Sequence, residues 1–540
     1  MTRLDELVSE YRRACDGFRW EVPDAFNFGR DVVDRYAAAD PGRPALLWRE
    51  ASGHERRLSF AAVREGSDRV ARGLHDLGLR PGEPVIVMLS RVPEWQLALL
   101  GALKAGALAI PSSTILRPKD VVYRARHSGA TCLVATDEQA AALEPARGEL
   151  AGLRLRIALR TPGGPDLPGG WLDWGDFLAA AEPRAPEVAT RASDPALVYY
   201  TSGTTGPPKA VLHAHAYTWA QRYTSSVWHG LRDGERIWTT SDTGWAKAAY
   251  GVLFGPWSLG AEVVLFHGRF DARTELALLS ELDPHVFCAP PTEFRLLVKE
   301  DLRGLRVPRL REVVSAGEPL NPEVIRAWRD ATGLTIRDGY GQTETILLVG
   351  NFPGLPVRPG SMGLPMPGHD VAVIDEDGGV LPPGEVGDIA LRGDPPSLFR
   401  GYWKDQGATE ACRRGEWYLT GDRAYRDADG WFWFVGRADD VIISAGYRIG
   451  PFEVESALVE HPAVLEAAAV AAPDALRGAI VKAFVVLRPG VSPSEALARA
   501  LQEHVKKVTA PYKYPRAVEF VAALPKTVSG KIRRVELRGR

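Results

Sequence analysis

A run of hydroxyl, glycine and lysine residues near position 200 carries the strongest chemical signal in the sequence. The run, Thr201–Lys209 (TSGTTGPPK), follows the apolar segment Ala196–Tyr200, which predicts a β-strand. Hydroxyls and unobstructed backbone N–H groups favour a concave donor surface that wraps phosphates, and Lys209 adds a cation. A surface loop without a ligand is the alternative interpretation. A P-loop is not predicted, because two prolines separate Gly206 from Lys209 and Ala210 follows the lysine.

A second segment, Asp338–Thr345 (DGYGQTET), combines glycine, aromatic and oxygen-bearing residues after the predicted strand Leu334–Arg337. Gly339 and Gly341, one on each side of Tyr340, let the backbone approach a flat ligand. Thr343 offers a hydroxyl, and Glu344 offers a carboxylate that suits Mg²⁺. Taken alone, the segment is equally typical of an ordinary glycine-rich turn after a strand.

Three weaker signals follow towards the C-terminus. Asp422 follows a glycine at the end of the predicted strand Trp417–Thr420, where a carboxylate can accept hydrogen bonds from a ribose; an ordinary turn aspartate is the alternative. The stretch 436–449 has an arginine near each end and predicts a hinge, although such charge clusters are usually solvated. Leu524–Lys531 places a lysine on a Ser-Gly turn, and a disordered basic tail is the alternative.

Short apolar runs alternate with helical patterns between about residues 84 and 340, which predicts parallel sheets covered by helices. The expected strands are Pro84–Leu89, Thr131–Thr136, Glu262–Phe266, His285–Ala289 and Glu312–Ser315. The expected helices are Glu94–Lys104, Thr274–Leu282, Thr292–Lys299 and Pro322–Asp330.

The pattern changes after about Gly350. Short strands at Val371–Asp375, Asp388–Arg392 and Trp417–Thr420 and an Asp-Gly hairpin at Tyr425–Phe432 predict a small β-rich subdomain. From Val441 the order is strand, helix (Pro451–Glu460), two strands (Leu465–Ala471 and Ala479–Leu487), helix (Ser494–Val508) and strand (Ala517–Val521).

The predicted fold class is therefore α/β. We expect a large N-terminal domain over residues 1–437, made of parallel-sheet α/β subdomains and the β-rich subdomain. A hinge at 438–440 and a small mobile C-terminal α+β domain over 441–540 follow.

Composition excludes several classes of protein. The 540 residues carry a net charge of −2, which argues against a nucleic-acid partner or a polybasic membrane binder. Four scattered cysteines exclude a CxxC zinc site and a disulfide framework. His213 and His215 lack further spaced ligands, and neither a zinc-protease nor a G-x-S-x-G motif occurs. With no long apolar run and no secretory or transit pattern at the N-terminus, we expect no integral membrane association and a cytoplasmic protein.

The five segments, in this order, resemble the acyl-adenylate-forming (AMP-binding) superfamily over about Phe26–Leu537. The medium-chain acyl-CoA synthetase branch is the most similar. The segments that resemble this branch are Asp242–Lys247 (DTGWAK), Val314–Glu323 (VSAGEPLNPE), Gly446–Glu455 (GYRIGPFEVE) and Ala510–Arg516 (APYKYPR).

The resemblance implies an acid–thiol ligase that uses ATP, Mg²⁺ and CoA. A carboxylate attacks the α-phosphate of ATP to give acyl-AMP and pyrophosphate, and the CoA thiol then takes the acyl group and releases AMP. It assigns catalytic roles to Lys531, Thr343 and Glu344, with Glu344 as the metal ligand. The ATP-binding residues it implies are Thr201, Ser202, Gly203, Thr204, Thr205, Gly206, Pro207, Pro208, Lys209, Glu318, Asp338, Gly339, Tyr340, Gly341, Gln342, Thr343, Asp422, Arg437 and Lys531.

For the second half-reaction the resemblance implies rotation of the C-terminal domain about Asp439. The CoA-binding residues it implies are Ala445, Gly446, Tyr447, Arg477, Tyr514, Pro515 and Arg516. Ala445 stands where the family usually has serine, which removes one hydroxyl from this segment. Trp245, Thr343 and Arg448 are the residues implied for the acyl substrate.

The expected substrate is a small carboxylic acid, either short- to medium-chain or aromatic, because the indole of Trp245 would shorten the acyl pocket; core packing is the alternative role of this residue. We also expect a homodimer and regulation by acetylation of Lys531, which removes its charge. The competing functions are an adenylating enzyme that loads a carrier protein, a ligase that stops at acyl-AMP, a luciferase-like oxygenase and a non-catalytic nucleotide-binding module. The last would predict loss of Lys209, Glu344, Asp422 or Lys531, yet all four are present.

Overall fold

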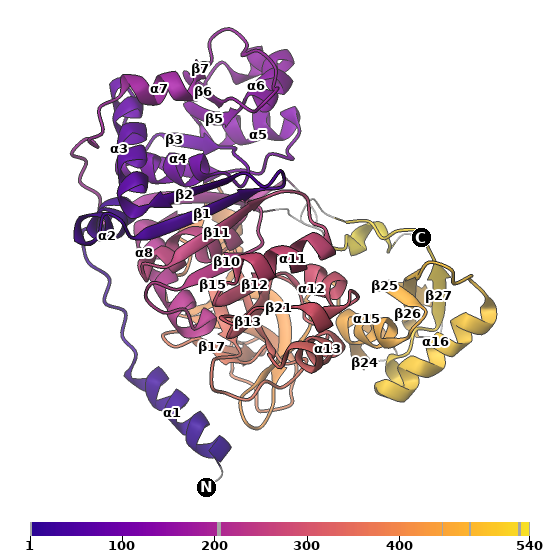
Figure 1. Cartoon of the computed structure of the whole chain (residues 1–540). Helices are drawn as coiled ribbons and strands as arrows, with labels where there is room; N and C mark the ends of the chain where they lie inside the picture. Colours follow the sequence, from indigo (N-terminus) through magenta and orange to yellow (C-terminus); the bar gives the residue numbers. More distant parts are fainter. Residues whose placement is uncertain (1–2, 202–206, 445–446, 475–476, 527–530, 539–540) are drawn as a thin grey trace.

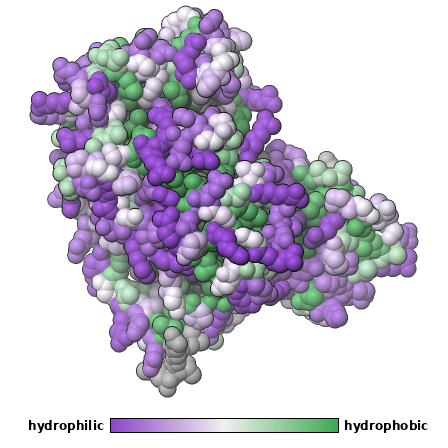
Figure 2. Space-filling view, in the orientation of Figure 1, coloured by the Kyte–Doolittle hydropathy of each residue, from purple (hydrophilic) through white to green (hydrophobic). Residues whose placement is uncertain are grey.

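The computed structural model describes residues 3–201, 207–444, 447–474, 477–526 and 531–538. A large unit holds three sheets, and a small C-terminal unit projects from one side of it (Figures 1 and 2). The mixture of parallel sheets, an antiparallel sheet and a small α+β unit confirms the predicted fold class. Among the described residues, no helix has both the length and the apolar character needed to cross a bilayer.

The first sheet has eight strands and is parallel from β7 through β8, and β9 and β19 complete it in antiparallel fashion. In spatial order they are β7 (Leu172–Asp173), β6 (Leu155–Leu159), β5 (Cys132–Thr136), β3 (Pro84–Val87), β4 (Leu108–Pro111), β8 (Pro195–Thr201), β9 (Lys209–Ala214) and β19 (Gly401–Tyr402). The predicted phosphate run joins β8 to β9, and Thr201 pairs with Lys209 at its two ends.

The second sheet has nine strands with a parallel centre and antiparallel edges. In spatial order they are β16 (Leu364–Pro365), β15 (Ile346–Gly350), β14 (Ile336–Gln342), β13 (Glu312–Ala316), β12 (Val286–Ala289), β10 (Arg236–Thr239), β11 (Glu262–His267), β1 (Pro44–Glu50) and β2 (Glu55–Ser59). Parallel strands buried on both faces explain the continuous apolar runs of the sequence.

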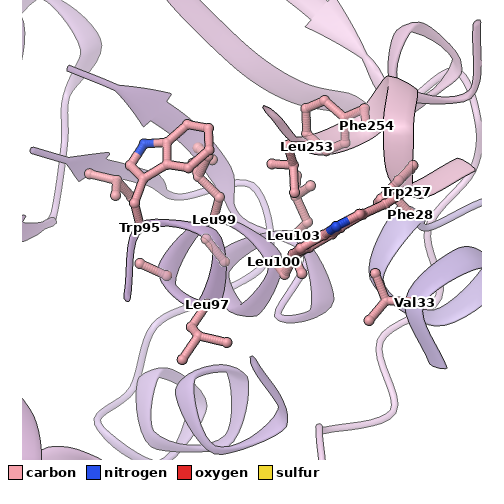
Figure 3. Close-up of a cluster of buried hydrophobic side chains, with 14 of the residues drawn as sticks. Phe28, Val33, Trp95, Leu97, Leu99, Leu100, Leu103, Leu253, Phe254 and Trp257 are labelled. Carbon is pink, nitrogen blue, oxygen red and sulfur yellow. The ribbon is translucent and has the colours of Figure 1, made fainter. Parts of the chain in front are cut away.

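Helices cover both sheets, and α4 (Pro93–Lys104) is buried along its whole length. A helix that is apolar all round belongs in a core. Figure 3 shows Leu100 and Leu103 of α4 on the side of Leu253 and Trp257, and Trp95 and Leu99 on another side of the helix, all in one core cluster. The other helices of the large unit are α1 (Arg3–Gly17), η1 (Gly29–Asp34), α2 (Arg35–Ala39), α3 (Phe60–Asp76), α5 (Pro118–Ser128), α6 (Asp137–Leu143), η2 (Glu144–Leu150), α7 (Trp174–Ala180), α8 (His215–Tyr223), η3 (Thr224–His229), α9 (Ala246–Ala248), η4 (Ala249–Leu253), α10 (Phe254–Ser258), α11 (Ala272–Leu282), α12 (Pro291–Leu297), η5 (Leu302–Gly304), α13 (Pro322–Thr332) and α14 (Gln406–Ala411).

The third sheet is antiparallel and forms the β-rich subdomain. Its strands are β17 (Asp370–Ile374), β18 (Gly387–Arg392), β21 (Trp417–Arg426), β20 (Arg413–Arg414) and β22 (Phe432–Arg437). The hairpin predicted from Asp-Gly joins β21 to β22, where Arg426 pairs with Phe432.

Two strands near the site are longer than the sequence predicted, and both corrections affect the site. β21 continues past Thr420 because β22 pairs with it from Asp422 to Arg426, so Asp422 lies inside a strand and not at its end. β14 begins at Ile336 and continues to Gln342 because β15 pairs with its second half. The predicted glycine-rich turn is therefore mostly strand, and the turn itself is Thr343–Thr345.

The small unit packs a three-stranded sheet against two helices. Its elements are β23 (Ile442–Ser444), β24 (Tyr447–Ile449), α15 (Pro451–Glu460), β25 (Val464–Asp474), β26 (Gly478–Leu487), α16 (Glu495–Val508), η6 (Pro511–Lys513), β27 (Ala517–Phe520) and η7 (Arg534–Glu536). The Asn321 Nδ2 at the start of α13 donates to the Ser456 Oγ of α15 at 3.1 Å, which joins the two units.

Candidate active site

The β8–β9 hairpin brings the two ends of the phosphate run together. Lys209 lies at the first position of β9, with its Nζ 4.7 Å from the ring centroid of Tyr402. The carbonyl of Pro208 accepts a hydrogen bond from the Tyr123 hydroxyl at 3.3 Å, and Pro207 is exposed. Five predicted residues of the run lie outside the described residues, namely Ser202, Gly203, Thr204, Thr205 and Gly206. The hairpin thus presents the Lys209 cation at the edge of the site.

Glu344 lies in the turn between β14 and β15, next to Lys209 and Tyr402. Its Oε1 accepts a hydrogen bond from the Tyr402 hydroxyl at 2.9 Å. The pKa of Glu344 is raised by burial, whereas the Tyr402 hydrogen bond and the charges of Lys209 and Arg437 act to lower it. Tyr402 was not predicted from the sequence, because it comes from β19, far from every motif.

The side chain of Asp422 is the acceptor at the centre of a hydrogen-bond network. Its Oδ2 accepts from the Tyr340 hydroxyl at 2.7 Å and from the Gln342 Nε2 at 2.8 Å. Gln342 also donates to the carbonyl of Thr420 at 2.8 Å and accepts from the Tyr418 hydroxyl at 3.0 Å. Tyr340 and Gln342 share one face of β14 because side chains alternate along a strand, and this alternation aims both at β21.

The charge around Asp422 is balanced by cations from two parts of the chain. Arg437 is its register partner on β22. The pKa of Asp422 is raised by burial, while the Tyr340 hydrogen bond and the charges of Arg437 and Lys531 lower it. Lys531 therefore lies close enough to the carboxylate for its charge to act on it. Lys531, the catalytic candidate of the C-terminal segment, is thus near Asp422 although the two residues are far apart in sequence.

Ion pairs attach the C-terminal segment to the predicted hinge. Arg534 bonds Glu455 at 2.7 Å and Asp440 at 3.4 Å, and Arg538 bonds Asp440. Asp439 lies between β22 and β23, with its carboxylate 3.5 Å from the guanidinium of Arg437. The alternative of a disordered basic tail is wrong for residues 531–538, because its arginines are paired.

Two residues predicted to bind the nucleotide, Asp338 and Glu318, have carboxylates that already accept hydrogen bonds from protein groups. Asp338 is buried and its Oδ1 accepts from the backbone N–H of Gly339, so its side chain faces the interior. Glu318 accepts from the Thr292 Oγ1 at 2.7 Å and from Arg295 at 2.9 Å. Any contact between Asp338 and a nucleotide would have to involve the backbone.

Steric crowding explains why glycine occupies two predicted positions of β14. A Cβ at Gly341 would lie 1.9 Å from the carbonyl oxygen of Ile346, and one at Gly339 would lie 2.7 Å from the ring of Trp228. Ile346 itself has φ +61°, a left-handed conformation that costs about 1–3 kcal/mol in a β-branched residue. Strain of this kind marks a turn that the surrounding structure holds firmly.

Of the predicted acyl residues, Thr343 directly follows Gln342 of the Asp422 network, and Trp245 comes from another part of the chain. Trp245 is half-buried and precedes α9 at the carboxyl end of β10. Ala445, Gly446 and the side chain of Arg448 lie outside the described residues.

The CoA candidates of the small unit include an exposed aromatic pair. Tyr447 stacks on Tyr512, with ring centroids 4.4 Å apart. Tyr514 accepts a hydrogen bond from Arg516 at 2.6 Å. Tyr512 and Lys513 were missed in the sequence, although they lie in the APYKYPR segment. The predicted residue Pro515 is buried, and Arg477 is exposed in the β25–β26 connection.

The donor set around Glu344 fits a magnesium ion that is shared with substrate. No group of three or more His, Cys, Asp or Glu side chains in the described part of the chain could hold a metal by itself. Mg²⁺ commonly takes one or two carboxylates and completes its shell with phosphates and water. A single carboxylate beside a phosphate hairpin agrees with this chemistry.

Comparison with known sequences gives two family matches. The AMP-binding enzyme family matches residues 33–403, and the AMP-binding enzyme C-terminal domain matches residues 453–531. Acyl-coenzyme A synthetase ACSM3 of Mus musculus, a mitochondrial protein, is 43% identical over 99% of this chain and 94% of its own length.

Solved structures give the same result. An anthranilate CoA ligase bound to anthranoyl-AMP superposes with a TM-score of 0.87 and 33% identity, covering 96% of this chain and 98% of its own. A benzoate CoA ligase from Burkholderia xenovorans superposes with a TM-score of 0.83 and 32% identity, covering 95% of this chain and all (100%) of its own.

The predicted cytoplasmic location is contradicted by these relatives. The mouse relative, like its rat and human counterparts, is mitochondrial. The prediction rested on the absence of a long apolar run and of a secretory or transit pattern, and an absence of this kind does not determine a location.

Proposed function

The chain belongs to the AMP-binding enzyme family and is an AMP-forming acid–CoA ligase, and from this premise we propose its acid class, its metal and the residues of its two half-reactions. The observation that carries the proposal is the Tyr340–Gln342–Asp422 network opposite Arg437, within the field of Lys531 and close to Glu344.

Adenylation must bring a carboxylate against a triphosphate. At about 4 Å and an effective dielectric near 20, each pair of like charges costs about 4 kcal/mol. Lys209 and its hairpin neutralise the β- and γ-phosphates, and Lys531 draws the acid and the α-phosphate together. Asp422 accepts from the ribose hydroxyls, and Tyr340 forms one side of the adenine site. Catalysis in this half-reaction is mainly positioning and charge stabilisation.

Glu344 is the proposed magnesium ligand. When bound, Mg²⁺ supplies positive charge that offsets the triphosphate and orients its oxygens. Burial raises the pKa of the Glu344 carboxylate, and the Tyr402 hydrogen bond and the Lys209 charge oppose this rise by favouring the ionised form. Thr343, one residue earlier, donates its hydroxyl to the α-phosphate or the acid.

Thioester formation uses the small unit after a rotation about residues 438–440, with Asp439 as the hinge. The proposed domains are 1–437 and 441–540. The Tyr447–Tyr512 pair and the cations that follow it suit CoA, which carries an aromatic base and phosphates. Ala445 and Gly446 would line the thiol path, and Arg448 would contact phosphate or acid.

The proposed acid is a short- to medium-chain or an aromatic carboxylate. Trp245 at the end of β10 supports a pocket of limited length. The similarity to an acyl-CoA synthetase and to anthranilate and benzoate CoA ligases supports both chemical types. We also keep a homodimer and acetylation of Lys531 as proposals.

The test is a panel of straight-chain acids from C2 to C12, together with benzoate and anthranilate. Acid-dependent pyrophosphate exchange reports adenylation, and AMP release with and without CoA reports the transfer. We expect saturation with C4–C8 or aromatic acids and a CoA requirement for AMP release. A preference for the longest acids would contradict the short pocket. Transfer to a carrier protein but not to CoA would contradict the acceptor.

A further inference from the structure

One fully buried histidine contacts the backbone of the turn that carries Thr343 and Glu344. His213 lies on β9, four residues after Lys209, and its Nε2 lies 2.7 Å from the carbonyl oxygen of Thr343. A carbonyl only accepts, so this nitrogen carries the proton. Burial lowers the pKa of His213 to about 3, so the ring is neutral at physiological pH. The neutral ring therefore donates to Thr343 as the tautomer with its proton on Nε2.

The ring of His213 is held in place by its neighbours. It stacks on Tyr217 with centroids 3.7 Å apart and meets the edge of Tyr199 at 6.2 Å. Its Nδ1 has no hydrogen-bond partner among the described residues. The ring thus has one polar contact, and that contact is with the turn.

Two other residues of β9 lie on the same side of the strand as His213. Lys209, Val211 and His213 alternate onto one side of the strand. Lys209 lies over Tyr402, which bonds Glu344, and Val211 packs in the cluster that contains Leu348 of β15. The start of β9 thus reaches the turn indirectly, through Tyr402, whereas His213 near its end bonds the turn directly.

The turn needs such support because it is strained. Ile346 has φ +61°, and a β-branched residue keeps that conformation only where other contacts impose it. The backbone N–H of Phe399 donates to the Glu344 carbonyl at 2.7 Å, and the Thr345 Oγ1 accepts from the N–H of Gln342. Among these hydrogen bonds, the one from His213 joins the turn directly to β9, the strand that follows the phosphate hairpin.

We propose that His213 is a positioning residue for adenylation, which fixes the Thr343–Glu344 turn relative to the phosphate hairpin by donating to the Thr343 carbonyl. This proposal rests on the proposed roles of Thr343 and Glu344. The turn that His213 fixes contacts the acid, the α-phosphate and the metal in the proposed mechanism, so the proposal concerns adenylation alone. Misplacing reacting groups by about 1 Å can cost about 100-fold in rate.

The test compares His213→Gln with His213→Met. The two side chains have similar length, but only glutamine has an amide N–H where the histidine Nε2 lies. We expect the methionine variant to lose about 10- to 100-fold in the kcat of pyrophosphate exchange and to need more Mg²⁺ for half-maximal rate. The glutamine variant recovers most of both. Both variants convert supplied acyl-AMP to acyl-CoA at the wild-type rate.

His215→Met is the matched control. His215 is also buried, two residues away, and burial lowers its pKa to about 4, but it contacts no residue of the turn. We expect it to lower the melting temperature without changing the Mg²⁺ requirement. Where the methionine variant at 213 does not fold, His213→Phe, which keeps a ring on Tyr217, takes its place with the same expectation.

Equal losses in the glutamine and methionine variants, or equal losses in both half-reactions, would overturn the proposal and leave His213 a packing residue. A change in Mg²⁺ requirement in the His215 control would do the same. Absence of acid-dependent exchange in the wild-type enzyme would instead overturn the proposed function.

Discussion

The proposed nucleotide site on β14 and β21 and the Tyr447–Tyr512 pair of the small unit both use tyrosine, but the tyrosines are packed in a core cluster in the first region and exposed in the second. On β14 and β21, Tyr340 and Tyr418 are packed inside the protein and each hydroxyl has a partner. On the small unit, Tyr447 and Tyr512 are 53% and 40% exposed and contact mainly each other. Tyrosine is thus used once as a fixed donor and once as an open stacking surface.

This difference indicates what each half-reaction requires. Adenylation develops charge at the α-phosphate, so its donors must be oriented beforehand in a site that excludes water. CoA takes part only in the second half-reaction and leaves with the acyl group, so the surface proposed to bind it can stay exposed until the proposed movement of the small unit. In the proposed mechanism adenylation needs Lys531 near Asp422, and in this structure the charge of Lys531 acts on that carboxylate.

The largest expected effect should appear in adenylation and not in thioester formation. Lys531→Ala removes a positive charge that the small unit places near Asp422. We expect pyrophosphate exchange to fall by about 100-fold or more, the order seen when a key charge donor is lost. Conversion of supplied acyl-AMP to acyl-CoA should stay near the wild-type rate. Equal losses in both assays would mean that Lys531 supports the fold and not the chemistry.

The second effect should appear only on the exposed face. Tyr512→Ala removes one half of the aromatic pair, and stacking of a base on an aromatic ring is worth about 1–3 kcal/mol. We expect the KM for CoA to rise about tenfold, with unchanged pyrophosphate exchange. Leu172→Ala, an exposed residue of β7 far from both regions, is the control. An unchanged KM for CoA would remove Tyr512 from the CoA site.

The elements of the small unit could be predicted well from local sequence. Pro451 at the first helical position gave α15 its start, and the helix covers Pro451–Glu460 as predicted. Proline, glycine and alternation act within a few residues, so they can be read without the fold.

The sequence could predict site residues that lie within a local motif, but not those brought to the site by pairing between distant strands. The length of β21 depends on its pairing with β22, and the inward aim of Asp338 depends on β13 and β14 being neighbours. Tyr402 and Tyr418 contact Glu344 and Gln342 across 58 and 76 residues. No local pattern encodes such contacts, although the alternation of buried Tyr418, Thr420 and Asp422 on β21 could have indicated Tyr418.

The third effect tests how the buried region keeps its carboxylate charged. Tyr402→Phe keeps the ring under Lys209 but removes the hydroxyl that donates to Glu344. Because that bond favours the ionised form, its loss raises the pKa of Glu344 further above its usual range. The acid limb of the pH profile of pyrophosphate exchange should therefore move to higher pH, with little change at alkaline pH. An acid limb that stays in place would show that Glu344 does not control it.

The smallest effect concerns the contact that holds the two regions in this arrangement. Ser456→Ala removes the acceptor of the Asn321 amide, while Arg295 still donates to Asn321 at 3.3 Å and keeps its side chain oriented. One such hydrogen bond contributes about 1 kcal/mol, so the arrangement with Lys531 near Asp422 should become about fivefold less favoured. Adenylation should slow two- to fivefold, as steady-state pyrophosphate exchange would show, while thioester formation keeps its rate or gains. Glu460→Gln offers the comparison, because its pair with Arg326 is 3.9 Å long and partly exposed, and such pairs contribute little. If the glutamine variant slowed adenylation as much as the alanine variant, the units would be held by general charge attraction and not by the Asn321–Ser456 bond.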